Sequence, residues 1–198
     1  MTMIVGIGGT MRPQSSTEMA LKIALEAANK QGARTRLFGG EFLLRLPHYG
    51  TPEATQSLEG KNLVEAVKQA DGLIVASPGY HGSVSGLVKN AIDYIEETAR
   101  DERVYLDGAP VGLIATAFGW QAAGGTLATL RSIVHALRGW PTPLGAAIKT
   151  SREMFVDGRC TDEGVQGQLE LVGRQVVQFA RLQPKNGTRP ATIDMCSA

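Results

Sequence analysis

The sequence predicts an α/β fold, a three-layer α/β/α sandwich built on a five-stranded parallel sheet. Five apolar segments alternate with segments of helical periodicity, which is the pattern of consecutive strand–helix–strand units. Because such crossovers are right-handed, we expect helices on both faces of the sheet. The expected strands are residues 3–8, 34–38, 72–76, 110–116 and 143–148.

The segments between these strands carry the apolar spacing of helices. Ser15 and Glu18 match a capping box at the start of the first helix, and Gly32 follows its end. The strand 72–76 is nearly all apolar, as expected of a central strand, whereas 34–38 is more polar and is predicted near a sheet edge. The expected helices are 16–31, 61–70, 126–137 and 161–182, and one that begins at Val84 or Leu87 and ends near Thr98.

The chain has 198 residues, which is the size of one domain with a substantial core. We expect that domain over residues 1–183. The segment 184–198 is polar, contains proline and glycine, and is predicted to be a flexible tail. Residues 39–60 are predicted to form a long connection, a feature that often serves as a lid or an interface.

The composition argues against several functional classes. The 20 basic and 19 acidic residues are well mixed, which is not typical of a nucleic-acid surface or a polybasic membrane anchor. Cys160 and Cys196 are too few for a disulfide framework, and the histidines His48, His81 and His135 show no metal-ligand spacing. No apolar run approaches the ~20 residues of a membrane span, and we see no signal peptide. We expect a protein of the reducing cytoplasm, without a metal.

Glycine gathers in three places, 6–9, 79–86 and 119–125, which follow the first, third and fourth predicted strands. In a parallel sheet the carboxyl ends of the strands lie at one edge, and ligands bind there near the point where the strand order reverses. The three glycine-rich loops are therefore expected to meet at one ligand site.

The first loop suits a phosphate. It lies beside a helix N-terminus, where unpaired N–H groups and the helix dipole favour an anion, and it offers the Arg12 guanidinium. The alternative is that Ser15 only caps the helix and Arg12 is solvated. The hydroxyl groups of this loop belong to Thr10, Ser15, Ser16 and Thr17.

Two other phosphate-binding motifs are not matched. No Gly-Lys-Ser/Thr follows the first strand, which argues against a nucleoside triphosphatase. Met11 stands where a dinucleotide fingerprint has its third glycine, and no acidic residue follows at the required distance. A monophosphate is therefore the preferred ligand of this loop.

The second loop, 77–85, presents turn residues whose N–H groups face a ligand, and Tyr80 is a candidate to line a flat ligand or, alternatively, a core aromatic. His81 is either a surface loop residue or, less favoured, a direct participant in catalysis. The third loop, 118–125, offers amides to the polar edge of a heterocycle. Trp120 is more typical of an interface or a lid than of chemistry.

These loops resemble motifs of the NAD(P)H-dependent FMN reductase family, which includes flavin, quinone, azo-dye and chromate reductases. The first family motif is approximately Gly-Ser-x-Arg-x-x-Ser-x-Asn, and residues 9–17 here are Gly-Thr-Met-Arg-Pro-Gln-Ser-Ser-Thr. Arg12 and Ser15 match, Thr10 takes the hydroxyl position, and Thr17 replaces asparagine. The resemblance implies that these four residues, with Ser16, surround the FMN phosphate.

The second family motif, Pro-Glu-Tyr-Asn-Gly-Ser-x-x-Gly-x-x-Lys-Asn-Ala-Ile-Asp, is matched over residues 78–93 as Pro-Gly-Tyr-His-Gly-Ser-Val-Ser-Gly-Leu-Val-Lys-Asn-Ala-Ile-Asp. Gly79 replaces glutamate and His81 replaces asparagine. In the family this loop borders the isoalloxazine ring. The third loop resembles the family's glycine-rich segment at the pyrimidine edge of the flavin, and Leu-Pro-His-Tyr at 46–49 resembles its Leu-Pro-x-Tyr segment.

The resemblance, which spans about residues 3–179, implies a flavodoxin-like fold, FMN as cofactor and NADPH or NADH as co-substrate. Hydride passes between the two cofactors, so no catalytic side chain is expected. Family members are usually dimers or tetramers, and Tyr49 and Trp120 are candidates for that interface. The cofactor-binding residues implied are Thr10, Arg12, Ser15, Ser16, Thr17, Pro78, Gly79, Tyr80, His81, Gly82, Ser83, Thr116, Phe118, Gly119, Gln121 and Gly124.

The resulting hypothesis is an NAD(P)H-dependent FMN reductase that passes electrons to an acceptor by a ping-pong mechanism. The first alternative is a quinone, azo-dye or metal-ion reductase with tightly bound FMN. The second is a flavodoxin-type electron carrier, against which the nearly neutral net charge of +1 argues, because such carriers tend to be acidic. The third is a binding module that has lost its cofactor.

Overall fold

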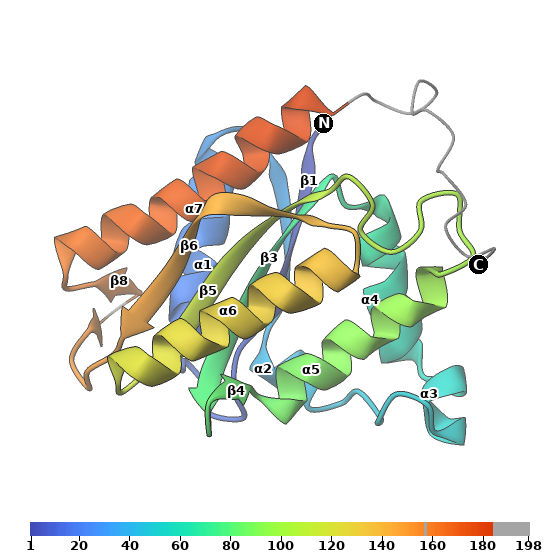
Figure 1. Ribbon diagram of the computed structural model, residues 1–198, viewed down its shortest axis with the longest axis horizontal. Helices are drawn as coiled ribbons and strands as arrows, with labels where there is room; N and C mark the ends of the chain where they lie inside the picture. Colours follow the sequence, from blue (N-terminus) through green and yellow to red (C-terminus); the bar gives the residue numbers. More distant parts are fainter. Residues whose placement is uncertain (157, 184–198) are drawn as a thin grey trace.

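The computed structural model of the chain describes residues 1–156 and 158–183. Its centre is a sheet with five parallel strands and helices on both faces (Figure 1), so the predicted α/β/α sandwich is confirmed. The strands are β1 (Met3–Gly8), β2 (Arg34–Phe38), β3 (Gly72–Tyr80), β4 (Ser83–Val84), β5 (Pro110–Ala117), β6 (Trp140–Lys149), β7 (Phe155–Val156) and β8 (Arg159–Cys160). The helices are α1 (Ser16–Lys30), α2 (Gly40–Leu43), α3 (Pro52–Gln56), α4 (Leu58–Gln69), α5 (Gly86–Asp93), the 3-10 helix η1 (Tyr94–Thr98), α6 (Trp120–Ala136) and α7 (Glu163–Leu182). The predicted tail, 184–198, lies outside the described residues.

The strand order of the parallel sheet is β2-β1-β3-β5-β6. The chain moves from β1 outward to β2 and then crosses back to β3, so the order reverses between β1 and β3. Ligands of doubly wound sheets bind at the carboxyl edge beside such a reversal. The edge position predicted for 34–38 is confirmed, because β2 is the first strand of this order. Two antiparallel pairs lie off the main path: β4 with β3, and β7 with β8.

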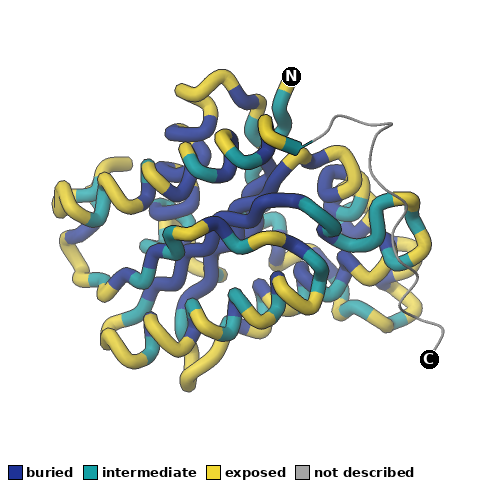
Figure 2. Tube along the Cα trace, turned by 45° about the horizontal axis from the view of Figure 1, so that its top comes forward, coloured by how far each residue is buried: buried dark blue, intermediate teal, exposed yellow. Residues whose placement is uncertain are grey.

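The sheet separates two hydrophobic cores because its side chains alternate between faces. On β3, Leu73 and Val75 enter the core that is completed by α4, α5 and α6. Ile74 and Ala76 enter the other core, which is completed by α1 and α7. Figure 2 shows this arrangement as a buried centre enclosed by helices whose outer sides are exposed.

Helix α7 lies directly against α1. A side chain on Gly173 of α7 would overlap the carbonyl oxygen of Ala24 in α1, so this glycine sets the close approach of the two helix backbones. At the far end of the contact, Arg181 donates a hydrogen bond to the carbonyl of Gln31, just past the end of α1. The same helix therefore covers one face of the sheet and closes the end of its neighbour.

The prediction of a long loop over residues 39–60 was wrong, because this connection contains helical segments. It contains α2 and α3, and α4 begins at Leu58, three residues before the expected Lys61. The short helices have four and five residues, too few for an apolar repeat to show in the sequence. Local signals still mark their starts, since Pro52 occupies the first turn of α3 and Ser57 caps α4 by accepting from the N–H of Gly60.

Three further boundaries differ from the prediction. The strand β3 continues to Tyr80 and pairs with β4, so all of the expected second loop except Ser85 is strand and hairpin. Helix α6 begins at Trp120 instead of 126. Gly124 and Gly125, which suggested a loop, therefore lie inside the helix, and a Cβ on Gly125 would be 3.7 Å from the Gly82 carbonyl. Strand β6 begins at Trp140 instead of 143. Its prolines, Pro141 and Pro143, are tolerated because β6 is an edge strand.

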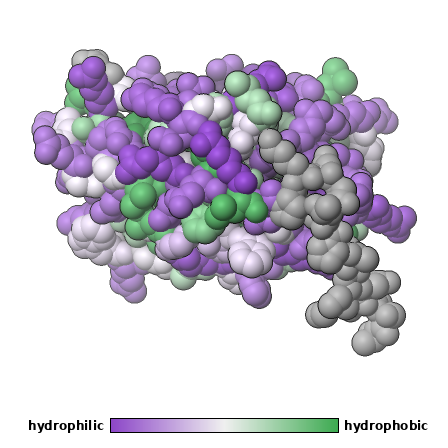
Figure 3. Space-filling view, turned by 90° about the horizontal axis from the view of Figure 1, so that it is seen from above, coloured by the Kyte–Doolittle hydropathy of each residue, from purple (hydrophilic) through white to green (hydrophobic). Residues whose placement is uncertain are grey.

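The surface carries mixed polar groups. The face shown in Figure 3 is mainly hydrophilic, with small hydrophobic areas between charged side chains. Of the helices in the described part of the chain, none is both long and apolar enough to cross a bilayer.

We predict that Gly173→Ala destabilises the fold by about 1–3 kcal/mol, because the added methyl group forces α7 away from the α1 backbone. The control is Gly167→Ala in the same helix. Gly167 is exposed and has nothing within 4 Å of its Cβ position, so this change should stabilise by about 0.5–1 kcal/mol through helix propensity. Urea unfolding of both variants gives the comparison. Equal stability of the two proteins would contradict the packing argument.

Candidate functional site

The carboxyl ends of β1, β3 and β5 lie side by side, as the three-loop prediction requires. Gly8, the last residue of β1, is paired with Ala76 of β3, and Pro78 of β3 is paired with Thr116 of β5. Because β3 continues to Tyr80, it extends beyond the end of β1. Figure 1 shows the β3–β4 hairpin and the start of α6 at the same end of the sheet.

A buried hydrogen bond joins the first and third of these segments. The hydroxyl groups of Thr17 in α1 and Thr116 in β5 are 2.7 Å apart, and both residues are buried. The structure therefore brings these two predicted site residues together. Their hydroxyls bond to each other in the interior, so neither is an isolated surface donor.

The first loop forms a tight turn above β1. The N–H of Arg12 donates to Oγ1 of Thr10 at 3.1 Å, and the Arg12 side chain is exposed with no ion pair to any described residue. Ser15 caps α1, since its Oγ accepts from the N–H of Glu18 at 3.3 Å. The first helical bond runs from Met19 to the carbonyl of Ser15.

Two backbone donors are left over at this helix start. Within residues 1–156 and 158–183, the N–H groups of Ser16 and Thr17 have no acceptor. Unpaired N–H groups at a helix N-terminus, at the positive end of the helix dipole, are a favourable site for an anion. Both readings of this loop therefore remain open: Ser15 caps the helix, and the N–H groups of Ser16 and Thr17 are still available to an anion.

The backbone of the first loop is packed tightly onto the start of α2. A Cβ on Gly9 would lie 2.6 Å from the Gly40 nitrogen, and one on Gly40 would overlap the Thr10 carbonyl. The carboxylate of Glu18 accepts from the N–H of Gly40 at 3.1 Å and pairs with Lys22 at 2.7 Å. Only half of the predicted capping box forms, because this carboxylate reaches α2 instead of returning to Ser15.

The second loop is a β-hairpin with a two-residue turn. Tyr80 pairs with Ser83, and the turn residues His81 and Gly82 have φ angles of 51° and 86°. Positive φ at both positions is the type I′ arrangement, which suits the twist of a hairpin and is typically formed by Asn-Gly. Histidine shares the tolerance of asparagine for this conformation. The turn therefore accounts for His81 at the position where the family motif has asparagine.

Gly79 is enclosed by helix α6. A Cβ there would lie 2.7 Å from Oγ1 of Thr126 and 3.1 Å from the carbonyl oxygen of Ala122. Thr126 also donates to the carbonyl of Ser83 at 3.3 Å, which ties the hairpin to the helix. The replacement of the motif's glutamate by Gly79 thus accompanies a close approach of α6. Pro78 is buried beneath the hairpin, next to the buried Ser77.

The third segment exposes large aromatic side chains. Phe118 is 81% exposed and Trp120 is 66% exposed, and Tyr80 of the neighbouring hairpin is 52% exposed. One glycine of the hairpin and two of the third segment border open space, because a Cβ on Gly82, Gly119 or Gly124 would have nothing within 4 Å. Gln121 is exposed on the first turn of α6.

The groups with shifted pKa values lie outside these three segments. Burial raises the pKa of the Cys160 thiol, on β8. Burial also raises the pKa of Tyr49, and its hydrogen bond to Glu97 acts in the same direction. Among the described residues, no group of three or more His, Cys, Asp or Glu side chains is arranged to hold a metal ion. Cys196 lies outside the described residues.

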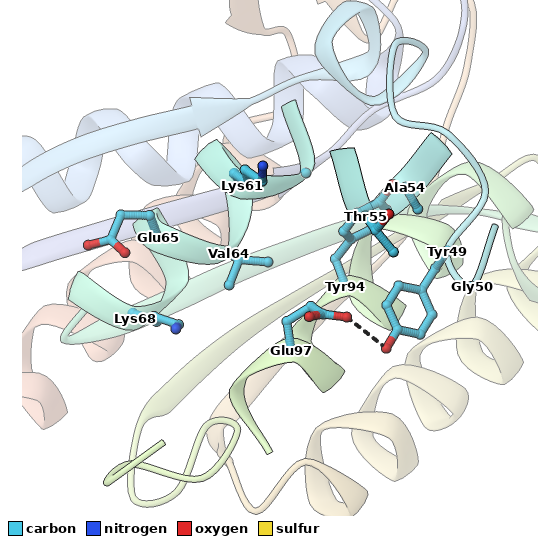
Figure 4. A pocket seen from close by; sticks show the side chains of 11 residues that line it. Tyr49, Gly50, Ala54, Thr55, Lys61, Val64, Glu65, Lys68, Tyr94 and Glu97 are labelled. Carbon is cyan, nitrogen blue, oxygen red and sulfur yellow. Dashed lines mark hydrogen bonds between the residues drawn. The ribbon is translucent and has the colours of Figure 1, made fainter. Parts of the chain in front are cut away.

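A separate cavity of about 350 Å³ lies between α3, α4 and η1 (Figure 4). Tyr49 and Tyr94 meet edge to face along one side, with ring centroids 5.4 Å apart, and the Tyr49 hydroxyl donates to Glu97 at 3.1 Å. Lys61 and Lys68 of α4 line another part. None of the sixteen predicted cofactor-binding residues belongs to this cavity.

Sequence reasoning missed three residues that shape the site: Glu18, Gly40 and Thr126. Each acts through the chain fold, by tying one segment to another that is distant in sequence. The pair Gly39-Gly40 directly after a predicted strand was a usable signal, because adjacent glycines at a strand end often mark a close backbone approach. No local pattern identifies the partners of Glu18 or Thr126.

The model of the family described as NADPH-dependent FMN reductase matches residues 2–152, which is more than half of this chain. The chain belongs to this family. Among curated proteins, the FMN-dependent NADPH-azoreductases of Staphylococcus haemolyticus (strain JCSC1435) and Staphylococcus aureus (strain USA300) are 34% and 38% identical over 127 and 129 residues. Each match covers 63% of this chain and 64% of the relative, so just under two thirds of those proteins is represented.

Solved structures of flavoproteins share the fold of this family member. FerB, a flavoenzyme NAD(P)H:(acceptor) oxidoreductase from Paracoccus denitrificans, gives a TM-score of 0.72 at 21% identity, covering 90% of this chain and 99% of that one. A WrbA-like flavodoxin from Agrobacterium tumefaciens gives 0.61 at 16% identity, covering 92% and 99%. The predicted flavodoxin-like fold is therefore confirmed.

We predict that the hairpin turn tolerates asparagine at residue 81 and rejects a β-branched residue. His81→Asn should leave the free energy of unfolding within about 0.5 kcal/mol. His81→Val should lower it by about 1–2 kcal/mol, because a β-branched side chain resists the left-handed conformation that asparagine and histidine tolerate. Thermal unfolding of the two variants measures this difference. If valine were accepted as readily as asparagine, the type I′ assignment would fail.

Proposed function

We propose that this protein is an NAD(P)H-dependent FMN reductase that transfers hydride from a nicotinamide to FMN and passes the electrons to a further acceptor. One observation carries the proposal: two unpaired helix N–H groups, those of Ser16 and Thr17, lie beside the exposed Arg12 at the carboxyl edge where the strand order reverses. This is the arrangement that a singly phosphorylated ligand of such a sheet requires.

The residues of the first loop fit the FMN phosphate. Arg12 supplies a positive charge and a forked set of donors, and the hydroxyls of Thr10 and Ser16 are partly exposed. Ser15 keeps its cap while its neighbours donate to the anion. Thr17 contributes its backbone N–H, and its side chain holds α1 to β5 through Thr116.

The other two segments fit a flat ring. Gly82, Gly119 and Gly124 each border open space that a methyl group would enter, so a ring can approach the backbone there. Tyr80 and Phe118 offer exposed rings, and Pro78, Gly79, His81, Ser83, Thr116 and Gln121 complete the assigned set. The start of α6 has no side-chain cap, and we assign its backbone N–H groups as donors to the polar edge of a heterocycle.

When bound, FMN supplies the chemistry by accepting hydride from the nicotinamide and releasing two electrons to the acceptor. The protein binds and orients the two rings, and holding them in contact replaces an acid or base side chain. The nicotinamide and the acceptor use the same open face in turn, which gives ping-pong kinetics. N–H groups at the start of α6 would serve as donors to the negative charge that the ring gains on reduction, as in an oxyanion hole.

The names of the relatives favour this activity and one variant of it. The curated relatives are named FMN-dependent NADPH-azoreductases, and one structural neighbour, 22% identical, is named an NADH:FMN oxidoreductase. The second candidate is therefore a reductase of azo dyes, quinones or metal ions with FMN held tightly. Whether FMN stays bound through dialysis separates the two.

A direct assay tests the activity. The purified protein should bind FMN, and NADPH or NADH should bleach the flavin absorbance within seconds under anaerobic mixing. A flavodoxin-type carrier would hold FMN yet remain oxidised in this experiment, and a module that has lost its cofactor would bind no flavin.

We further propose that the protein acts in the cytoplasm as a homodimer or homotetramer. The free thiol of Cys160 is compatible with a reducing compartment. The cavity beside Tyr49 is a candidate contact point between copies. Light scattering coupled to size exclusion gives the oligomer size.

We predict that Arg12→Ala weakens FMN binding by about tenfold or more, since a charge-assisted bond to the phosphate is worth about 1.5–3 kcal/mol. The control is Arg100→Ala, which removes an exposed arginine just beyond η1 and the same net charge. Titration of apoprotein with FMN, followed by quenching of flavin fluorescence, measures both. Equal affinities in the two variants would contradict the phosphate assignment.

We predict opposite effects of Gly124→Ala on stability and on FMN affinity. The added methyl favours the helical state of α6 and should raise the unfolding free energy of the apoprotein by about 0.5–1 kcal/mol. It also enters the open space assigned to the ring, so FMN binding should weaken. Gly167→Ala, a helical glycine with equally open surroundings on α7, should stabilise without affecting FMN. A Gly124→Ala protein that binds FMN like the parent would remove Gly124 from the site.

A further inference from the structure

We propose that Trp120, supported by Phe118, selects planar aromatic electron acceptors over small inorganic ones. This inference rests on the proposed function, because it assigns a specificity-determining residue to the same site. The observation behind it is the pair of large aromatic side chains, 66% and 81% exposed, on the short segment that connects β5 to α6.

Their exposure is not a consequence of a loose backbone. The carbonyl of Ala117 accepts two hydrogen bonds from Thr150, from its N–H at 2.8 Å and from its hydroxyl at 3.3 Å. The carbonyl of Gly119 accepts from the N–H of Ala123 at 3.0 Å and so starts helix α6. Ala117 and Gly119, the residues on both sides of Phe118, are thus fixed by hydrogen bonds, and the backbone that carries the two rings is held at the surface.

The segment is continuous with the proposed flavin site. The Cβ of Ala117 lies 3.4 Å from the Cβ position of Gly79, and the carbonyl of Ala122 lies 3.1 Å from it. Residues 117–122 therefore border the β3–β4 hairpin, which also carries the half-exposed Tyr80. A molecule that stacks on the flavin at this rim comes within reach of the two aromatic rings.

The charge of the segment indicates the type of molecule. Residues 116–130 contain no Asp, Glu, Lys, Arg or His, so this segment has no charged side chain that could form an ion pair with a metal complex or an inorganic ion. It offers ring faces, and contacts between aromatic rings are worth about 0.5–1.5 kcal/mol beyond area burial. A flat conjugated acceptor gains this contact, whereas a compact ion such as ferricyanide does not.

The acceptor step balances without a side-chain acid. A quinone takes two electrons and one proton as a hydride equivalent from the reduced cofactor and a second proton from water, and becomes a hydroquinone. Two ferricyanide ions take one electron each from the same source and become ferrocyanide. NAD(P)H supplies both electrons in either case, so the first half-reaction is the same for the two acceptors and any difference between them arises in the acceptor half-reaction.

The chain contains a matched control for Trp120. The sequence has two tryptophans, and Trp140 is 67% exposed, nearly the same as Trp120. Trp140 begins β6, whereas Trp120 follows the end of β5, so in these parallel strands the two lie at opposite edges of the sheet. A general effect of replacing an exposed tryptophan should appear at both residues. An effect that comes from contact with the acceptor should appear at Trp120 alone.

The first experiment labels the holoenzyme with 5-fluorotryptophan and records its fluorine NMR spectrum. Two resonances are expected, and Trp140→Phe assigns them. Adding 2-methyl-1,4-naphthoquinone to the oxidised holoenzyme, without a nicotinamide, should shift or broaden the Trp120 resonance and leave that of Trp140 in place. An unmoved Trp120 resonance would overturn the proposal. A Trp120 resonance that instead follows protein concentration would overturn it in favour of a second copy as the occupant.

The second experiment compares steady-state rates of Trp120→Ala and Trp140→Ala with the two acceptors. For Trp120→Ala, the ratio of kcat/KM for the quinone to kcat/KM for ferricyanide should fall roughly three- to tenfold, mainly through a higher KM for the quinone. Trp140→Ala should keep the parent ratio. An unchanged ratio in Trp120→Ala would refute the inference while leaving the reductase function intact. A parent protein that binds FMN but reduces neither acceptor would instead refute the proposed function, and the inference with it.

Discussion

The buried bond between Thr17 and Thr116 is the contact on which the site depends. It joins the first turn of α1, where the unpaired N–H groups lie, to the end of β5, from which the aromatic segment departs. A buried hydrogen bond adds only about 0.5–1.5 kcal/mol to stability, but losing one partner leaves a buried hydroxyl unsatisfied. The distance between the phosphate end and the ring end of the proposed site is therefore fixed in the interior, before a ligand binds.

The outer side of the same loop is held by a different kind of contact. Gly9 and Gly40 allow two backbone segments to touch, and Glu18 fastens them by accepting from the N–H of Gly40. A carboxylate in the first turn of α1 would weaken the attraction of this helix end for an anion if it faced the loop. Its bonds to Gly40 and Lys22 direct the carboxylate toward α2 and partly neutralise it.

The sequence was sufficient for the architecture and for the meeting of the three segments, because both follow from strand–helix alternation and from the shared carboxyl edge of a parallel sheet. It was insufficient where tertiary contacts decide. Gly124 and Gly125 looked like a loop, yet they lie inside α6, which the hydrogen bond from Thr126 to the carbonyl of Ser83 ties to the hairpin. The hairpin turn was missed because His81-Gly82 is a rarer form of a recognisable signal, Asn-Gly, whose left-handed conformation it shares. The assigned cofactor-binding roles remain predictions, because they concern contacts with a ligand.

Both departures from the family motif preserve the course of the backbone. Gly79 removes a side chain where α6 approaches, and His81 keeps the positive φ that the turn requires. Neither change alters the hydrogen-bonding groups that the hairpin backbone presents at the rim. The flavin site that we propose would be formed largely by backbone N–H groups and by close backbone approach. The exposed side chains around it, such as Phe118 and Trp120, are then free to set which acceptor stacks there, while cofactor binding is retained.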